Sequence, residues 1–428
     1  MRGRLAALLG ALALFANSVM AQDLLIRNAT VHTATSRGTL QSSDVLVRGG
    51  VIRAVGLGLS APGVPAVDAG GRPLTPALFG GISGIGLEEV SLESPTVDST
   101  LALGENAHDM VVRPEFDATL AYNPDSVLVP VTRVEGIGFT VLAAGSAAGG
   151  SIIGGQGGVM RLDGGPDPIG ARLLFVRLGA DVANLTGNSR AAQWMILDQL
   201  INEARGRVPY TAPGTLLTPA GRIALARFLD GRGRMLVTAH RAADIRQLLR
   251  WSKRHGVRLA INGGAEAWKL ASELAAAKVP VFVDTLANLP ADFDSIGASL
   301  SNAARLHAAG VQVAFAQSGD ASHNARKVRQ LAGNAVANGL PWDAGLAGLT
   351  SVPAAALGVA DRVGSIAPGR IADLVLWSGD PLEVNTLAEQ VWLGGRTISM
   401  RSRQTELRDR YLRAPGVLPR AYPADDGR

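Results

Sequence analysis

Apolar and polar residues alternate with a period of two near both ends of the chain, which is the pattern of half-buried β-strands that end at glycine-rich turns. A charged helical pattern follows the last of these stretches, at residues 403–413. Because the two strand-rich ends flank a long middle segment, we expect them to pair into one small β-sandwich. The strand-like stretches are residues 23–34, 43–56, 64–72, 370–381 and 389–400.

The middle of the chain alternates short apolar strands with amphipathic helical patterns. Strands separated by helices pair in parallel through right-handed crossovers, so this series predicts an α/β fold with a (β/α)8 TIM barrel. Residues 139–145 and 172–179 would supply earlier barrel strands, and an open doubly wound sheet is the alternative. The four clearest strand-to-helix units are 233–239 with 244–256, 257–263 with 265–278, 279–285 with 293–310, and 311–319 with 323–339.

A glycine-rich stretch, residues 145–158, interrupts this rhythm. A dinucleotide-binding loop would need a strand, a G-x-G-x-x-G sequence and a helix in succession, and this stretch does not supply them. The backbone amides of residues 149–158 could bind an anion, but we interpret the segment as a connection between barrel elements.

The first residues read as a cleavable signal peptide, with the basic start "MRGR", the apolar run "LAALLGALALFA" and small residues before Gln22. The run is too short to span a bilayer comfortably, and no second long apolar run follows. We expect cleavage after Ala21, no membrane span afterwards, and a periplasmic or secreted protein.

Composition narrows the chemistry further. The chain has no cysteine, which excludes disulfides, thiolate nucleophiles and cysteine-ligated metals. Cleavage removes Arg2 and Arg4 and so lowers the formal charge from +5 to +3. Arginines are scattered and aromatic residues make up only 4% of the chain, so we expect no nucleic-acid partner.

Three stretches together resemble the amidohydrolase superfamily, in particular its imidazolonepropionase-like and prolidase-like branch. They are residues 28–56, residues 123–145, and residues 349–383 with the specific order G-x-x-D-R-x-G-S-I-x-P-G-x-x-A-D-L-V. The resemblance implies a metal-dependent hydrolase of C–N bonds, built as a barrel capped by a composite β-sandwich. It divides the chain into a signal peptide (1–21), an N-terminal sandwich segment (22–75), the barrel (76–364), and a C-terminal sandwich segment with the final helix (365–428).

The same resemblance places the family's metal ligands at the ends of barrel strands, and here those positions carry poor donors. The His-x-His pair of the first strand falls on Ile82 and Gly84, and the later ligand positions fall on Thr238, Gly263 and Ser318. A catalytic divalent metal needs about three protein ligands. We therefore expect no metal and no other cofactor; a divalent metal such as zinc is the expectation only if these assignments are wrong.

Four residues near predicted strand ends are candidate catalytic groups: His240, Asp284, Asp320 and His323. Active sites of barrels lie at the C-terminal ends of the strands, which favours a substrate contact or an acid–base role. The structural alternatives are a helix cap for His240, a solvated loop position for Asp284, and an N-cap near residue 324 for the other two.

Three functions remain open at this point. The chain is a pseudo-hydrolase that acts as a binding or partner subunit, a hydrolase of C–N bonds with a displaced site, or a periplasmic binder of small ligands. The corresponding partners are a small-molecule or peptide-like ligand, a second copy of the chain, or an intact paralogous subunit. Fold alone does not choose among them.

Overall fold

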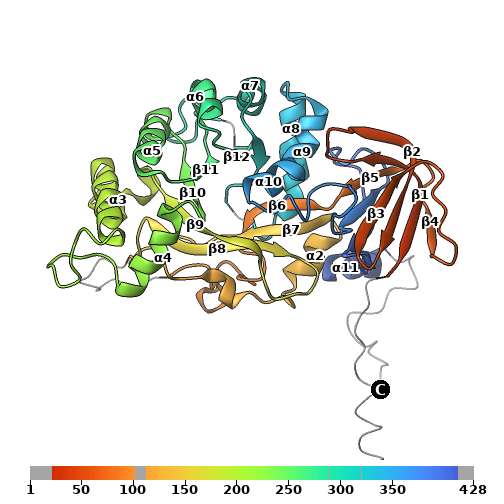
Figure 1. Cartoon of the computed structure of the whole chain (residues 1–428), viewed down its shortest axis with the longest axis horizontal. Helices are drawn as coiled ribbons and strands as arrows, with labels where there is room; N and C mark the ends of the chain where they lie inside the picture. The colour runs from red at the N-terminus through yellow and green to blue at the C-terminus, as the bar shows by residue number, and fades with distance from the viewer. Residues whose placement is uncertain (1–21, 102–111, 288, 320, 413–428) are drawn as a thin grey trace, which may run out of the picture.

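The computed structural model describes residues 22–101, 112–287, 289–319 and 321–412. Its centre is an eight-stranded sheet that curls into a nearly closed barrel, which confirms the predicted fold class (Figure 1). The strands follow one another in chain order around the sheet. They are β6 (Leu78–Ser83), β7 (Ile137–Leu142), β8 (Ile153–Arg161), β9 (Ile169–Arg177), β10 (Arg234–Ala239), β11 (Leu259–Gly263), β12 (Val281–Val283) and β13 (Val313–Phe315).

One barrel strand differs from the all-parallel expectation. The second half of the glycine-rich stretch is not a connection but the start of strand β8, which runs antiparallel to both β7 and β9, whereas residues 145–152 do connect β7 to β8. Its glycines permit close packing against the neighbouring backbone, since a Cβ added at Gly157 would lie 2.0 Å from the Leu142 carbonyl oxygen. Alternation of side chains could not reveal this strand, because glycines carry none.

Helices cover the outside of the barrel sheet, where β9 to β13 lie beneath α3 to α10 (Figure 1). The predicted helix at 293–310 begins only at Asn302, because the Asp292 carboxylate accepts the amides of Asp294 and Ser295 and folds the preceding residues into a turn. The helices are α2 (Leu128–Arg133), α3 (Arg190–Ala204), α4 (Pro219–Leu229), α5 (Ala242–His255), α6 (Ala271–Ala276), α7 (Asn302–Ala308), α8 (Val328–Ala337), α9 (Trp342–Leu349), α10 (Ser351–Ala356) and α11 (Arg403–Tyr411).

The two ends of the chain share a second sheet, which lies beside the barrel (Figure 1). β5 joins the ends, since it pairs with β1 on one side and with β14 on the other. The sheet closes over its own apolar core, which includes the buried Trp392. Its strands are β1 (Leu24–His32), β2 (Thr39–Arg48), β3 (Val51–Gly56), β4 (Ala66–Asp68), β5 (Pro73–Pro76), β14 (Leu374–Trp377), β15 (Ala388–Leu393) and β16 (Arg396–Thr397).

A buried ion pair ties this sheet to the barrel. The guanidinium of Arg161, at the end of β8, donates to both carboxylate oxygens of Asp373, just before β14, at 3.3 and 2.7 Å. Burial raises the pKa of Asp373, and the charge of Arg161 opposes that shift. Among the residues that the structure describes, no helix has the length and apolar character needed to cross a membrane.

Candidate functional site

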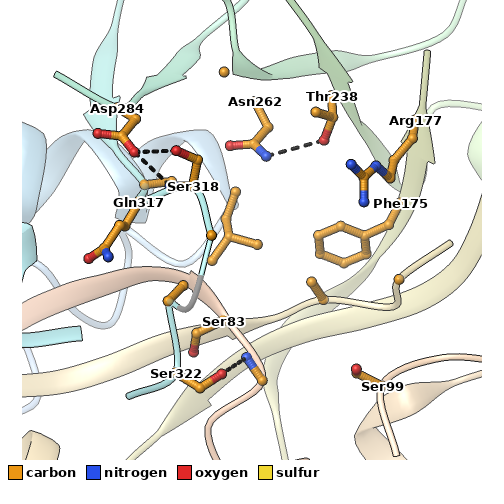
Figure 2. Close-up of a pocket in the computed structure, with 18 of the residues that line it drawn as sticks. Ser83, Ser99, Phe175, Arg177, Thr238, Asn262, Asp284, Gln317, Ser318 and Ser322 are labelled. Atoms are coloured by element: carbon orange, nitrogen blue, oxygen red, sulfur yellow. Dashed lines mark hydrogen bonds between the residues drawn. The ribbon is translucent and has the colours of Figure 1, made fainter. Parts of the chain in front are cut away.

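A cavity of about 560 Å³ opens at the C-terminal ends of the barrel strands (Figure 2). Residues from the ends of β6, β9, β10, β11, β12 and β13 line it, so the barrel brings together side chains that are far apart in the sequence. Its size is that of a small-ligand site. All five positions where the resemblance placed metal ligands lie on its wall: Ile82, Gly84, Thr238, Gly263 and Ser318.

At the first strand, β6, the side chain of Glu88 in the following loop lies beside Gly84, one of the positions where the resemblance places a metal ligand. The amide of Gly84 donates to the Ser322 hydroxyl at 2.9 Å, and that hydroxyl donates to Glu88 Oε2 at 3.1 Å. A Cβ added at Gly84 would lie 3.1 Å from the same Glu88 oxygen. These bonds join the segment after β6 to the segment after β13, where the barrel sheet has its two edges.

At the sixth strand, the ring of His240 occupies the space that a side chain at position 263 would need. A Cβ added at Gly263 would lie 2.4 Å from His240 Cε1, and the backbone φ of +88° at Gly263 favours glycine as well. Beside it, Asn262 Nδ2 donates to the Thr238 hydroxyl at 3.2 Å (Figure 2). Two ligand positions are therefore accounted for by contacts between β10 and β11.

After the eighth strand, β13, Ser318 donates hydrogen bonds to the carboxylate of Asp284. Its backbone amide and its hydroxyl both donate to Asp284 Oδ2, at 2.7 and 2.6 Å (Figure 2). The other oxygen of Asp284 accepts the amides of Leu286 and Ala287 at 2.9 and 3.1 Å. The four donors hold this carboxylate in place and occupy the lone pairs that proton abstraction would need.

Two of the four predicted catalytic candidates, His240 and Asp284, lie on the cavity wall. His240 does not cap α5, because the amide of Ala242 donates to Glu266 instead. His323 is not among the lining residues, and its ring contacts Glu88 and the Glu89 carbonyl oxygen. Asp320 lies outside the described residues.

Sequence reasoning missed two polar groups in the cavity. Arg177 ends β9, and its buried Nε has no hydrogen-bond partner among the described residues, although its Nη2 pairs with Asp181. Gln317 follows β13, and its buried Oε1 also lacks a partner within the described ranges. Figure 2 shows Arg177 and Gln317 on opposite sides of the cavity. The position of Arg177 at the end of a predicted barrel strand was the available signal.

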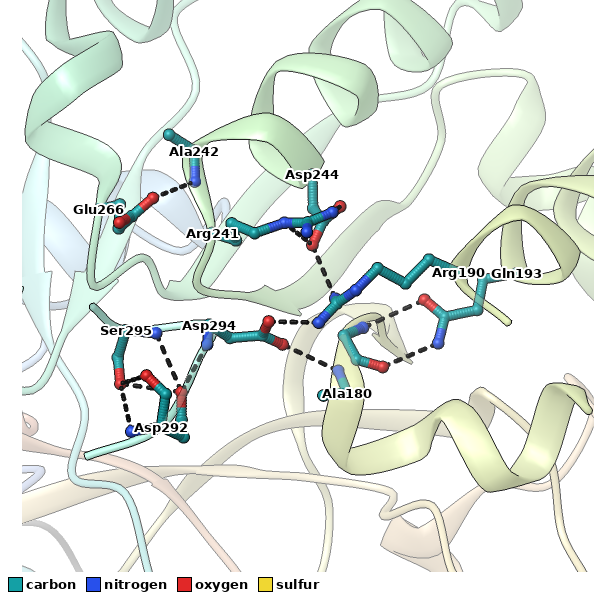
Figure 3. Close-up of polar contacts among 11 residues, drawn as sticks. Ala180, Arg190, Gln193, Arg241, Ala242, Asp244, Glu266, Asp292, Asp294 and Ser295 are labelled. Carbon is teal, nitrogen blue, oxygen red and sulfur yellow. Dashed lines mark hydrogen bonds and ion pairs between the residues drawn. The ribbon is translucent and has the colours of Figure 1, made fainter. Parts of the chain in front are cut away.

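A network of ion pairs, which we call the rim network, joins the segment that follows β12 to α3 and α5 (Figure 3). Arg190 donates to Asp244 at the start of α5, at 2.9 Å, and to Asp294 in the segment that follows β12. Asp294 also accepts the Ala180 amide at 2.8 Å. Burial alone would raise the pKa of Asp294, but the Ala180 amide and Arg190 outweigh it and lower that pKa. The segment that carries Asp284 is therefore anchored at its far end to two helices.

Comparisons with known proteins agree with this fold. The profile of the amidohydrolase family matches residues 235–399. An amidohydrolase from Thermotoga maritima is 27% identical, with a TM-score of 0.76, over 88% of this chain and 100% of that one.

The profile match over residues 235–399 and the shared fold support membership of the amidohydrolase superfamily.

Other similarities are narrower or more distant. Amidohydrolase tasK from Hapsidospora irregularis is 47% identical over 57 residues, which are 13% of this chain but only 6% of that protein. A prolidase complexed with N-methylphosphonate-L-proline has a TM-score of 0.53 and 14% identity, over 88% of this chain and 99% of that one. Atrazine chlorohydrolase from Arthrobacter aurescens, complexed with zinc, has a TM-score of 0.50 and 18% identity, over 90% of this chain and 98% of that one. Identities this low show a shared fold.

The zinc of that distant superfamily member raises the question of whether this cavity fits a metal. Ile82, Gly84 and Gly263 offer no side-chain donor, and the hydroxyls of Thr238 and Ser318 already take part in hydrogen bonds within the protein. Among the described residues, no three histidine or carboxylate side chains stand close enough together to hold an ion. The donor set therefore does not fit a metal of the family type.

Gly263→Ala tests the contact between positions 263 and 240. The added methyl group overlaps the His240 ring and takes a strained φ, so we expect a loss of about 2–4 kcal/mol in the free energy of unfolding. Gly231→Ala is the matched control, because its φ is +75° but the nearest atom would be 3.8 Å away. His240→Ala should restore some of the loss in the double variant. Equal urea midpoints for the two glycine variants would show that the ring does not fill this space.

Arg190→Gln tests the rim network through its pH dependence. A carboxyl whose folded pKa is lowered stabilises the protein above its ordinary pKa and loses that contribution as the pH falls through the lowered value. We expect the variant to lose about 3 kcal/mol at pH 7, and the gap to the wild type to narrow below about pH 4. Urea unfolding between pH 7 and pH 3 measures it. A gap that stays constant with pH contradicts the role assigned to Asp294, and the solvent-exposed Arg232→Gln should show no gap.

Proposed function

We propose that this exported member of the superfamily is a pseudo-hydrolase that binds a small organic ligand at the barrel mouth without a metal. One observation carries the proposal: four of the five positions expected to hold a metal ligand, all but Ile82, are either filled by a neighbour or hydrogen-bonded within the protein. The His240 ring stands against Gly263, and Ser318 donates to Asp284. Simple loss of ligands would leave unpaired polar groups, whereas this mouth has replaced them with contacts of its own.

Two polar groups of the cavity without hydrogen-bond partners in the described part of the chain indicate which chemical groups a ligand would carry. Arg177 Nε is a cationic donor without an acceptor, and Gln317 Oε1 is an acceptor without a donor, within the described residues. Buried polar groups of this kind are usually satisfied by a ligand or by water. A small or peptide-like molecule with a carboxylate at one end and an N–H donor at the other would satisfy both. Phe175 adds an apolar surface beside Arg177 (Figure 2).

A hydrolase with a displaced site is less well supported. Hydrolysis needs a base that can take a proton from water, and the carboxylate of Asp284 already accepts four hydrogen bonds. Among the described residues of the cavity wall, His240 and Glu88 are the other groups with acid–base capacity, and Glu88 Oε2 already accepts the Ser322 hydroxyl.

A partner subunit is the second candidate role, and the exposed apolar residues of the segment after β12 favour it. The segment between β12 and α7 exposes large apolar side chains, with Leu289 at 69%, Phe293 at 86% and Ile296 at 60% exposure. Exposed apolar groups that cluster on a fixed segment are typical of association surfaces. Recovery of the chain alone after mild extraction would count against this role.

The metal content of the purified protein tests whether the barrel mouth works without a metal. We expect far less than one equivalent of zinc, manganese or iron after dialysis against each metal, and no change in melting temperature with a chelator. A stoichiometric metal whose removal lowers the melting temperature would overturn the proposal. In that case His240→Ala shows whether His240 is a ligand.

Arg177→Gln tests the ligand site itself. Probed by calorimetry with a panel of dipeptides and N-acetylated amino acids, the wild type should bind members that carry a free carboxylate. The variant should bind them at least about tenfold more weakly, since a charge-assisted hydrogen bond contributes about 1.5–3 kcal/mol. Arg232→Gln, an exposed arginine paired with Asp230, should bind as the wild type does. If Arg177→Gln keeps full affinity, the carboxylate does not bind there.

A further inference from the structure

A second cavity, of about 930 Å³, lies at the opposite end of the strands from the barrel mouth. Its wall is formed where β10 and β11 begin and where α5 and α6 end, so it is separate from the site at the C-terminal strand ends. We call it the basic groove, because six cationic side chains line it: Arg234, Arg246, Arg250, Lys253, Arg258 and Lys278.

Within the part of the chain that the structure describes, carboxylates do not balance the charge of the basic groove. Glu273 is the one carboxylate among the lining residues, and it pairs with Arg246 at 3.4 Å. In the described ranges no ion pair is found for Arg250, Lys253 or Lys278. An excess of like charge in one cavity costs free energy unless an anion from outside neutralises it.

Two arginines of the basic groove, the half-buried Arg234 and the exposed Arg258, are held by backbone carbonyls rather than by carboxylates. Arg234 donates to the Leu259 carbonyl oxygen, and Arg258 donates to the Gly231 carbonyl oxygen at 3.3 Å. Burial, together with the neighbouring charge of Arg258, lowers the pKa of Arg234 to about 10. Arg234 still carries its positive charge at neutral pH, so the groove presents neighbouring guanidinium groups.

Helix dipoles do not explain the whole of this arrangement. The partial negative charge at the C-terminus of α5 favours a cation such as Lys253 in its last turn. Arg234 starts β10 and Arg258 precedes β11, and strand starts exert no comparable field. The convergence of strand and helix cations on one cavity therefore points to a ligand.

We propose that the basic groove binds a phosphate-bearing anion. A phosphate group carries up to two negative charges on a compact set of oxygens, and the planar guanidinium group matches it through paired hydrogen bonds. A single carboxylate would neutralise too little of the charge. Apolar side chains such as Leu249, Val257 and Val279 also line the groove, so the bound molecule has room for an apolar portion beside its phosphate. A free phosphate ester and a lipid headgroup share this chemistry.

Calorimetry with inorganic pyrophosphate and sedimentation with lipid vesicles test the proposal and separate the two sources. We compare the full chain with Arg250→Gln/Lys253→Gln, because both side chains are exposed and neither pairs with a carboxylate in the described structure. The control is Arg53→Gln/Arg403→Gln, which removes the same charge from exposed positions elsewhere. Vesicles contain either phosphatidylglycerol or phosphatidylcholine.

We expect one pyrophosphate per chain, bound at least about tenfold more weakly by the groove variant and unchanged by the control, since each charge-assisted hydrogen bond contributes about 1.5–3 kcal/mol. Binding to phosphatidylglycerol vesicles alone, lost in the groove variant, supports the same site with a lipid headgroup as ligand. Equal weakening in both double variants would mean that only net charge matters and would overturn the proposal. Absence of binding to either probe would overturn it too.

Discussion

Polar groups at the mouth of this barrel must find partners, and that requirement organises the whole site. Strand ends bring backbone amides, hydroxyls and carboxylates into one partly buried cavity, where an unpaired group costs free energy. In a metalloenzyme the cation satisfies such groups. Here, within the described residues, most of them satisfy one another, Arg177 Nε and Gln317 Oε1 excepted. Ser322 bridges Gly84 and Glu88, Asn262 donates to Thr238, and Ser318 donates to Asp284.

The contact between His240 and Gly263 also fixes the mouth, but through steric exclusion rather than hydrogen bonds. An imidazole ring can stand at this place only if the neighbouring strand end carries no Cβ, and Gly263 meets that condition. The two residues therefore constrain each other. A histidine at position 263 would require the His240 ring to move.

The two cavities of the barrel differ in the charges that line them. The mouth combines Arg177 with the carboxylates Glu88 and Asp284, so charges of both signs line it. The basic groove at the other end of β10 and β11 carries almost only positive charge. Because one set of strands separates the sites, each can be altered without direct contact with the other.

Periodicity was enough to predict most of the scaffold, and particular residues show where it failed. Strands β10 to β13 were found from apolar runs followed by helices, because burial of these segments leaves a local pattern. Strand β8 was missed, since its glycines are placed by the proximity of the β7 backbone rather than by alternation. The start of α7 was misplaced because the Asp292 side chain competes for backbone amides.

The sequence by itself determined the barrel, the shared sheet of the two ends, and the absence of donor side chains at Ile82, Gly84 and Gly263. These features depend on local hydrophobic patterns and on side-chain chemistry, both of which can be read along the chain. Only the tertiary structure decided what stands beside these positions and that Arg177 and Gln317 line one cavity on opposite sides. Those relations join residues on different strands, and the free energy of such contacts depends on distances that exist only once the barrel has closed.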